Sequence, residues 1–129
     1  MKVLALDYGS ARTGVAVSDP TGSLARPLCV VEQAASDAGL ARIRDLIQAE
    51  SADRVVVGLP LTLRGEHGEQ ARETERFAEA LRAAAPVPVE LFDERFTTDL
   101  AEAGGRAPVD ARAAAHLLSS YLAWSSRRT

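Results

Sequence analysis

Hydrophobic and polar positions follow two different periods along this chain, and each change of period marks a change of secondary structure. Short apolar runs, partly β-branched, cover residues 2–8, 12–19 and 27–32, with glycine-containing turns between them. This pattern predicts three antiparallel strands, of which the first two form a hairpin. In residues 36–51 the apolar positions recur with helical spacing and Ser36 can cap the start, so we expect a helix there.

The second half of the chain alternates between strand and helix. Residues 54–60 carry a continuous valine run, which is typical of a strand buried on both faces of a parallel sheet. Residues 69–85 and 111–124 have apolar positions at helical spacing, and residues 87–95 read VPVELFDER, a fifth strand. The order βββαβαβα predicts an α/β fold: a five-stranded mixed sheet with helices on both faces, whose first, fourth and fifth strands are parallel.

Ligand sites of open α/β sheets lie beyond the carboxyl ends of the parallel strands. In this chain those ends are Asp7, the segment 58–60 (GLP) and the segment 93–95 (DER). Three pieces of sequence that are far apart along the chain should therefore meet at one edge of the sheet. Asp7 follows a buried apolar strand directly, where a carboxylate has a large desolvation cost unless a cation or hydrogen-bond donors compensate for it.

Acidic residues at this edge predict a site for a divalent cation. Two or three carboxylates together repel one another unless a metal ion neutralises them, and we expect Asp7 and Glu94 to be such neighbours. Asp110, at the start of the last predicted helix, is the third candidate, because a helix N-terminus keeps a carboxylate ionised. Oxygen ligands without a cluster of cysteine and histidine favour Mg²⁺ or Mn²⁺ over zinc.

Each of these acids also has a purely structural interpretation. Asp7 can serve the turn ahead of a glycine, and Asp110 can simply cap the last helix. Asp93 or Glu94 can pair with Arg95 at the surface. The sequence pattern by itself leaves these alternatives open.

Composition and charge limit the classes of partner. The 129 residues suit one domain with its own core, and the net charge of −3 gives no global basic field, so any site for a polyanion must be local. Every basic residue except Lys2 is an arginine, a preference that suits bidentate phosphate contacts and that a GC-rich coding bias also produces. The two histidines, His67 and His116, are expected to be solvated or to pack, without a part in catalysis.

Other features of the sequence point to the cytoplasm. The single cysteine, Cys29, cannot form an internal disulfide, and no apolar run approaches the roughly 18–20 residues of a membrane span. The first residues, MKVLALDYG, reach an acid too soon for a signal peptide. We therefore expect a cytoplasmic protein with no membrane partner.

Four sequence blocks resemble those of a known family. DYGSARTGVAVSDP, VVVGLPL, VELFDERFTT and VDARAAAHLLSSYL are similar, in this order, to the signature blocks of the YqgF family, also called RuvX, and together they cover nearly the whole chain. The resemblance implies one RNase H-like nuclease domain over residues 1–129, in a cytoplasmic bacterial protein. It also implies metal-dependent hydrolysis of phosphodiester bonds in pre-16S rRNA, at the 5′ end of the mature 16S sequence.

The resemblance also assigns roles to the acids. Its acidic positions correspond here to Asp7, Glu94 and Asp110, with Asp93 the less probable ligand of its pair. These residues are implied to be both catalytic and metal-binding. Two ions, Mg²⁺ or Mn²⁺, would then bind the scissile phosphate, one activating water and the other stabilising the leaving oxygen.

Three arginines near the same edge could hold the flanking phosphates: Arg12, Arg64 and Arg95. One departure from the family concerns the segment between Thr98 and Val109, which is shorter here than usual, so that the arm expected to grip RNA is shortened or missing. The implied partner is pre-16S rRNA or branched DNA, and we expect a monomer or a weak homodimer.

Three other functions stay open at this point. A related nuclease could resolve Holliday junctions in DNA. DYGSARTG also resembles the phosphate loop of the actin–hexokinase ATPases, although those proteins enclose their nucleotide between two domains. A non-catalytic factor that binds ribosomal RNA or a protein would use the same acids only for caps and ion pairs.

Overall fold

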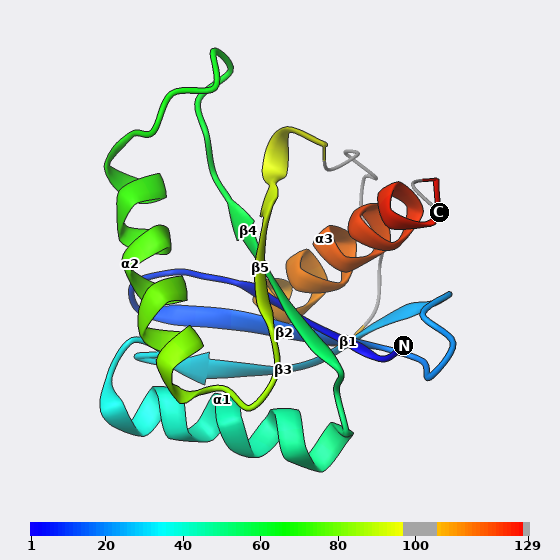
Figure 1. The fold of residues 1–129 in the computed structure, drawn as a ribbon. Coiled ribbons are helices and arrows are strands. Elements are labelled where there is room, and N and C mark those ends of the chain that lie inside the picture. The colour runs from blue at the N-terminus through cyan, green and yellow to red at the C-terminus, as the bar shows by residue number, and fades with distance from the viewer. Residues whose placement is uncertain (97–105, 128–129) are drawn as a thin grey trace.

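A computed structural model describes residues 1–96 and 106–127 of the chain (Figure 1). Its strands are β1 (Val3–Asp7), β2 (Arg12–Ser18), β3 (Ala25–Glu32), β4 (Arg54–Leu59) and β5 (Val89–Asp93). Its helices are α1 (Asp37–Glu50), α2 (Glu69–Ala84), the short 3₁₀ helix η1 (Glu94–Phe96) and α3 (Val109–Ser126). Within these described ranges no helix is long and apolar enough to cross a membrane.

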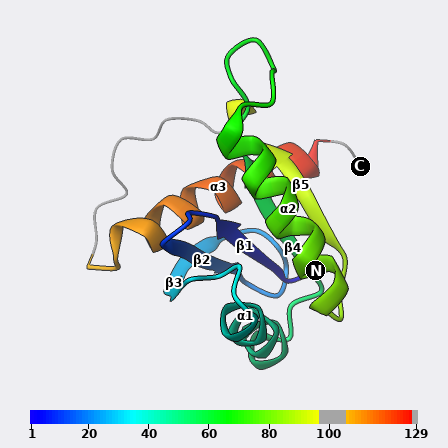
Figure 2. The same cartoon turned by 90° about the vertical axis from the view of Figure 1, so that its left-hand side faces the viewer.

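The five strands form one mixed sheet in the order β3-β2-β1-β4-β5. β1, β2 and β3 are antiparallel neighbours, whereas β4 and β5 run parallel to β1, as expected for strands joined through α1 and α2. Helices cover both faces of the sheet, with α1 and α2 on one side and α3 on the other (Figures 1 and 2). The predicted fold class is therefore confirmed.

The alternation of side chains along β1 sorts the core into two layers. Leu4 and Leu6 belong to the cluster that α1 and α2 complete, whereas Val3 and Ala5 belong to the cluster that α3 completes. All four side chains are buried. Because successive side chains of a strand point to opposite faces, Asp7 follows Val3 and Ala5 and faces α3.

Several predicted boundaries differ from the observed ones by one or two residues, and two of these differences have a clear local reason. Strand β5 ends at Asp93 and not at Arg95, because the Asp93 carboxylate accepts a hydrogen bond from the backbone N–H of Arg95 at 2.9 Å and so bends the chain into η1. Helix α3 begins at Val109 and not at residue 111, directly after Pro108, whose fixed φ suits a helix start.

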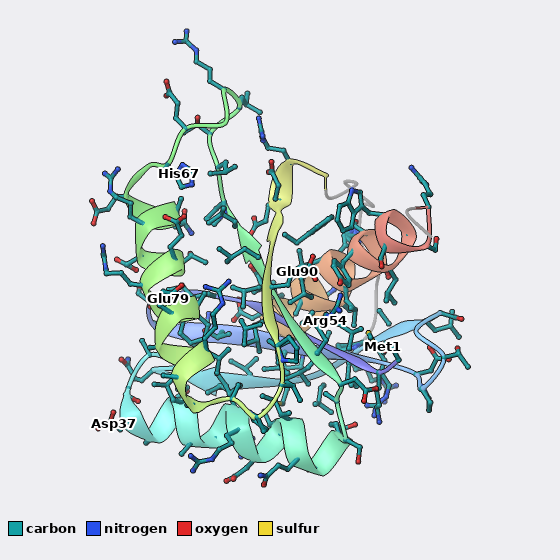
Figure 3. All side chains as sticks on the ribbon, viewed as in Figure 1. Met1, Asp37, Arg54, His67, Glu79 and Glu90 are labelled. Atoms are coloured by element: carbon teal, nitrogen blue, oxygen red, sulfur yellow. The ribbon has the colours of Figure 1, made fainter. Side chains whose placement is uncertain are left out.

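The second half of α3 is fixed to the sheet by aromatic and polar contacts. Phe92 of β5 meets Tyr121 edge to face, with ring centroids 5.5 Å apart, and also contacts Trp124. The Tyr121 hydroxyl donates to Glu90 at 2.8 Å and accepts from Arg54 at 3.0 Å. Arg54 and Glu90, both labelled in Figure 3, also form an ion pair at 3.2 Å.

The first turn of α3 lies directly on the backbone of β2. A Cβ atom added at Gly14 would stand 1.8 Å from the carbonyl oxygen of Asp110 and 3.0 Å from the backbone nitrogen of Ala111. Both obstacles are main chain, so a side chain at this position can be accommodated only if the helix moves. Gly14 is also the antiparallel partner of Asp7, which places the start of α3 beside that acid.

We predict that Gly14→Ala lowers the free energy of unfolding by about 3 kcal/mol, the upper part of the usual range for overpacking, because the obstacle is backbone. Chemical denaturation, monitored by circular dichroism, measures this loss of stability. Gly68→Ala is the matched control, since an added Cβ there has nothing within 4 Å. The control should lose less than about 1 kcal/mol through a weaker helix cap. Equal losses in the two variants would show that α3 does not depend on Gly14.

Candidate functional site

A cavity opens at the carboxyl ends of the parallel strands, on the face of the sheet that α3 covers. Its volume is about 190 Å³, and it is lined by Asp7, Glu94, Ala113, His116 and Leu117. Asp7 is the last residue of β1, Glu94 begins η1 directly after β5, and the other three residues come from α3. The structure thus brings together two of the predicted acids at the predicted edge.

Strand alternation explains why Glu94 faces the cavity and Asp93 does not. Glu90 and Phe92 both contact Tyr121 of α3, so these alternating positions of β5 face α3, and Glu94, the first residue of η1, lines the cavity on the same face. Asp93 binds Arg95 instead. The preference for Glu94 over Asp93 as the acid of the site therefore has a geometric basis.

Gly58 of β4 makes room for the Glu94 side chain. A Cβ atom added there would stand 2.7 Å from Glu94 Oε2, 3.0 Å from Glu94 Cγ and 3.1 Å from Leu117 Cδ2. The missing side chain of β4 is thus replaced by a carboxylate from the segment after β5 and a leucine from α3. This arrangement holds Glu94 between the sheet and the helix.

The carboxylates of the cavity oppose each other's ionisation. Burial raises the pKa of Asp7 above its usual value, and the negative charge of Asp110 raises it further. Burial, followed by the charges of Asp7 and Asp93, raises the pKa of Glu94 to about 7. A divalent cation between these groups would relieve both effects, since it stabilises the charged forms.

Asp110 lies beside Asp7 but is held by an arginine. It is the second residue of α3, and its carboxylate forms an ion pair with Arg12 at 3.2 Å. The interpretation of Asp110 as a simple helix cap is wrong: the N-cap is Pro108, and within the described part of the chain no side chain caps this end of α3. The carboxylate still lies in the first turn, where the helix dipole favours its charge.

The three predicted acids form a row with Asp7 in the middle. Leu117, which packs beside Glu94, follows Asp110 by seven residues, or about 10 Å along the helix axis. Over residues 1–96 and 106–127, no three His, Cys, Asp or Glu side chains are close enough to one another to hold a metal ion. The acids thus offer two neighbouring pairs, and not one three-ligand cluster.

The three predicted phosphate-binding arginines have different environments. Arg12 is largely exposed beyond its ion pair with Asp110. Arg95 is bound to Asp93 through Nε and Nη2, and its Nη1 donates to the carbonyl oxygen of Leu63 at 3.5 Å. Arg64 is exposed in the loop between β4 and α2, and it has no ion pair within the described residues.

Sequence reasoning missed His116. It was expected to pack or to be solvated, but it lines the cavity with Asp7 and Glu94. Helical spacing could have indicated the position of His116, because residues 113, 116 and 117 lie on the same side of α3 as Asp110. His67 is exposed, as expected, and pairs with Glu75 at 3.2 Å.

The shortened segment that was expected to contain the RNA-binding arm, between Thr98 and Val109, lies mostly outside the described residues. Of this segment the structure describes residues 106–108, which lead into α3.

Residues 1–124 match the family model of RuvX, which is described as a Holliday junction resolvase. A similar protein of Chloroflexus aurantiacus is 43% identical, over 93% of this chain and 85% of its own length. One of an Anaeromyxobacter species is 42% identical, over 95% of this chain and 96% of its own length. Both relatives carry the name "Putative pre-16S rRNA nuclease".

Two solved structures share the fold over nearly the whole chain. The structure of Thermus thermophilus RuvC has a TM-score of 0.70 at 18% identity and covers 100% of this chain and 98% of its own. T. thermophilus RuvC in complex with Holliday junction substrate has a TM-score of 0.67 at 21% identity and covers 99% and 96%. These likenesses confirm the RNase H-like fold.

We predict that Glu94→Gln stabilises the metal-free protein increasingly as the pH rises from 5 to 8. The folded state holds a proton on Glu94 up to about pH 7, whereas the unfolded state releases it near the ordinary value of 4.5. In this interval the folded state binds more protons, so wild-type stability falls with rising pH, and glutamine removes that loss. Thermal unfolding in a chelator, at a series of pH values, measures the difference.

The control for this prediction is Glu32→Gln, which removes a glutamate charge at an exposed position of β3. Its difference from the wild type should stay flat over the same pH interval. A flat or falling difference for Glu94→Gln would contradict the electrostatic account of the cavity.

Proposed function

Because the chain belongs to the RuvX family, we propose that it is a metal-dependent nuclease that hydrolyses phosphodiester bonds at the 5′ end of pre-16S rRNA. The single observation that carries this proposal is the row of acids with Asp7 at its centre, at a cavity beyond the strand ends. The names of the similar proteins supply the substrate. We further propose that residues 1–129 act as one domain, in the cytoplasm, as a monomer or a weak homodimer.

The residues present suit hard divalent cations in their chemistry. Asp7 with Glu94, and Asp7 with Asp110, each offer carboxylate oxygens, the ligands that Mg²⁺ and Mn²⁺ prefer. The raised pKa values of Asp7 and Glu94 support this assignment, because burial and neighbouring acids disfavour their charged forms and no ion pair within the described residues compensates them. Two such ions would supply neutralisation of the scissile phosphate and activation of the attacking water.

The protein's own residues set where the phosphate can bind. Asp7 is fixed by β1 and Glu94 by the space over Gly58, so the two carboxylates that face the cavity come from rigid elements. Leu117 and Ala113 of α3 form the apolar wall on the other side. With a net charge of −3, attraction of RNA depends on local cations, of which Arg64 and Arg12 are exposed at this edge.

A second candidate substrate is branched DNA, which the description of the matching family favours. The same acids and the same hydrolysis would serve it, so only a comparison of substrates separates the two. The phosphate-loop alternative is disfavoured, because Glu69 and Glu73 of α2 border the loop at Gly9 and Ser10 and would repel a nucleotide phosphate. A non-catalytic RNA-binding factor remains the alternative that the next experiment addresses.

We predict that Asp7→Asn abolishes cleavage of a labelled 16S precursor fragment in Mg²⁺ or Mn²⁺, because it removes the carboxylate that both neighbouring pairs share. The folded state should be at least as stable as the wild type at neutral pH in a chelator, since the substitution removes a charge that burial disfavours. Asp45→Asn, at an exposed position of α1, should cleave like the wild type. Failure of the wild-type protein to cleave RNA or a DNA junction under any metal condition would favour the binding-factor alternative.

We also predict that Gly58→Ala lowers the rate of cleavage by about tenfold to a hundredfold, because the added methyl group displaces the Glu94 carboxylate. Stability should fall less than in Gly14→Ala, since the obstacles here are side-chain atoms that can move. Single-turnover kinetics and chemical denaturation test the two statements. Wild-type rates in Gly58→Ala would show that the position of Glu94 over β4 is unimportant for cleavage.

A further inference from the structure

A second cavity lies at the same edge of the sheet, on the face that α2 covers. Its volume is about 270 Å³, and its lining consists of Tyr8, Gly9 and Ser10 from the turn after β1 and of Glu69, Gln70 and Glu73 from α2. Tyr8 follows Asp7 directly, so strand alternation places the two side chains on opposite faces of the sheet. The two cavities are thus separated only by the end of β1 and the turn that follows it.

An aromatic ring forms a rigid wall of this cavity. Tyr8 stacks on Phe77 of α2, with ring centroids 4.4 Å apart and an interplanar angle of 18°. Burial raises the pKa of Tyr8, and the negative charge of Glu73 raises it further against the opposing charge of Arg76. The Glu73 carboxylate therefore lies near the tyrosine, at the wall of the cavity.

The two carboxylates of the lining differ in their partners. Glu69 is paired with Arg72 at 3.8 Å. Glu73 is half-buried and makes no hydrogen bond or ion pair within the described part of the chain. Such a carboxylate repels phosphate and accepts hydrogen bonds from a neutral ligand that carries N–H groups.

The size and the lining of the cavity favour one planar ring system. A volume of about 270 Å³ is below the ~300–1,000 Å³ of pockets that enclose drug-sized ligands. An aromatic wall provides a stacking surface, as in proteins that bind unpaired bases of single-stranded RNA. The cavity is therefore suited to a single base and not to a whole nucleotide with its phosphate.

We propose that this cavity binds a guanine base of the RNA strand, next to the phosphate that is cleaved. This rests on the proposed nuclease function, because the strand must pass from the acids over the turn at Gly9 and Ser10. Guanine is the one RNA base whose Watson–Crick edge presents two adjacent donors, N1–H and N2–H₂, which match the two oxygens of the Glu73 carboxylate. Adenine, cytosine and uracil each place an acceptor beside their donor, which the second oxygen repels.

The test measures binding without cleavage, in the Asp7→Asn protein with a chelator present. Three heptamers of uridine are compared by fluorescence anisotropy: one with a central guanosine, one with a central inosine, which lacks the N2 amino group, and one of uridine alone. The guanosine heptamer should bind about tenfold to a hundredfold more tightly than the inosine heptamer, the factor for one hydrogen bond to a charged group. When Glu73→Gln is added to the Asp7→Asn protein, the affinities for the guanosine and inosine heptamers should differ by less than about twofold.

Glu79→Gln is the matched control, because it makes the same change on α2 at an exposed position that pairs with Arg82. It should keep the preference for guanosine. Equal affinities for the three heptamers, or a preference that Glu73→Gln retains, would overturn the guanine site.

Cleavage assays separate this proposal from the proposed function. In the protein with Asp7 intact, the guanosines of a precursor fragment are replaced by inosine one at a time. The replacement at one position near the scissile bond should slow cleavage, and Glu73→Gln should remove that effect. If the RNA is cleaved and no inosine replacement slows the cleavage in this way, the guanine site alone is overturned. A guanosine preference in binding, together with no cleavage in any metal, overturns the nuclease proposal alone.

Discussion

Helix α3 crosses the sheet at close range, and this crossing depends on two positions of the strands beneath it that carry no side chain. Gly14 of β2 lies under Asp110, and Gly58 of β4 lies under Leu117 and Glu94. β1 runs between these strands, so the two glycines are two strand spacings apart, or about 10 Å. The seven residues from Asp110 to Leu117 rise by about the same distance. The dimensions of a helix and of a sheet therefore match at this place, and Asp7, at the end of β1, lies between the two contacts.

The same close crossing explains the electrostatics of the site. Burial raises the pKa values of Asp7 and Glu94; the charge of Asp110 raises that of Asp7 further, and the charges of Asp7 and Asp93 raise that of Glu94 further. A sequence selected for stability alone would avoid such a group of carboxylates, and proteins commonly retain this kind of cost at functional sites. Arg12 compensates only Asp110, at the exposed end of the row. Neither acid of the inner pair has an ion pair within the described residues, and the assignment of a cation site rests on this.

Much of this architecture could be predicted from the sequence, because it depends on local periodicity. Short stretches of sequence are enough to predict the valine run of β4, the hairpin of β1 and β2, and the alternation that places Glu94 on the face of Asp7. The turn at Asp93, the ion pair of Asp110 and the position of His116 could not be predicted in the same way. Each depends on which residues tertiary packing brings together, and single-residue patterns carry no information about such partners.

The link from Arg95 to the loop between β4 and α2 shows how this edge of the protein can change over evolutionary time. Arg95 reaches the loop through the main-chain carbonyl of Leu63, and it is anchored at its other end by Asp93. The side chains of Leu63 and Arg64 take no part in this connection. Substitutions at Leu63 and Arg64 can therefore change the surface of this loop while the segment next to Glu94 keeps its geometry, whereas a side chain at Gly65 would meet the Arg95 guanidinium, 3.1 Å from its Nη1.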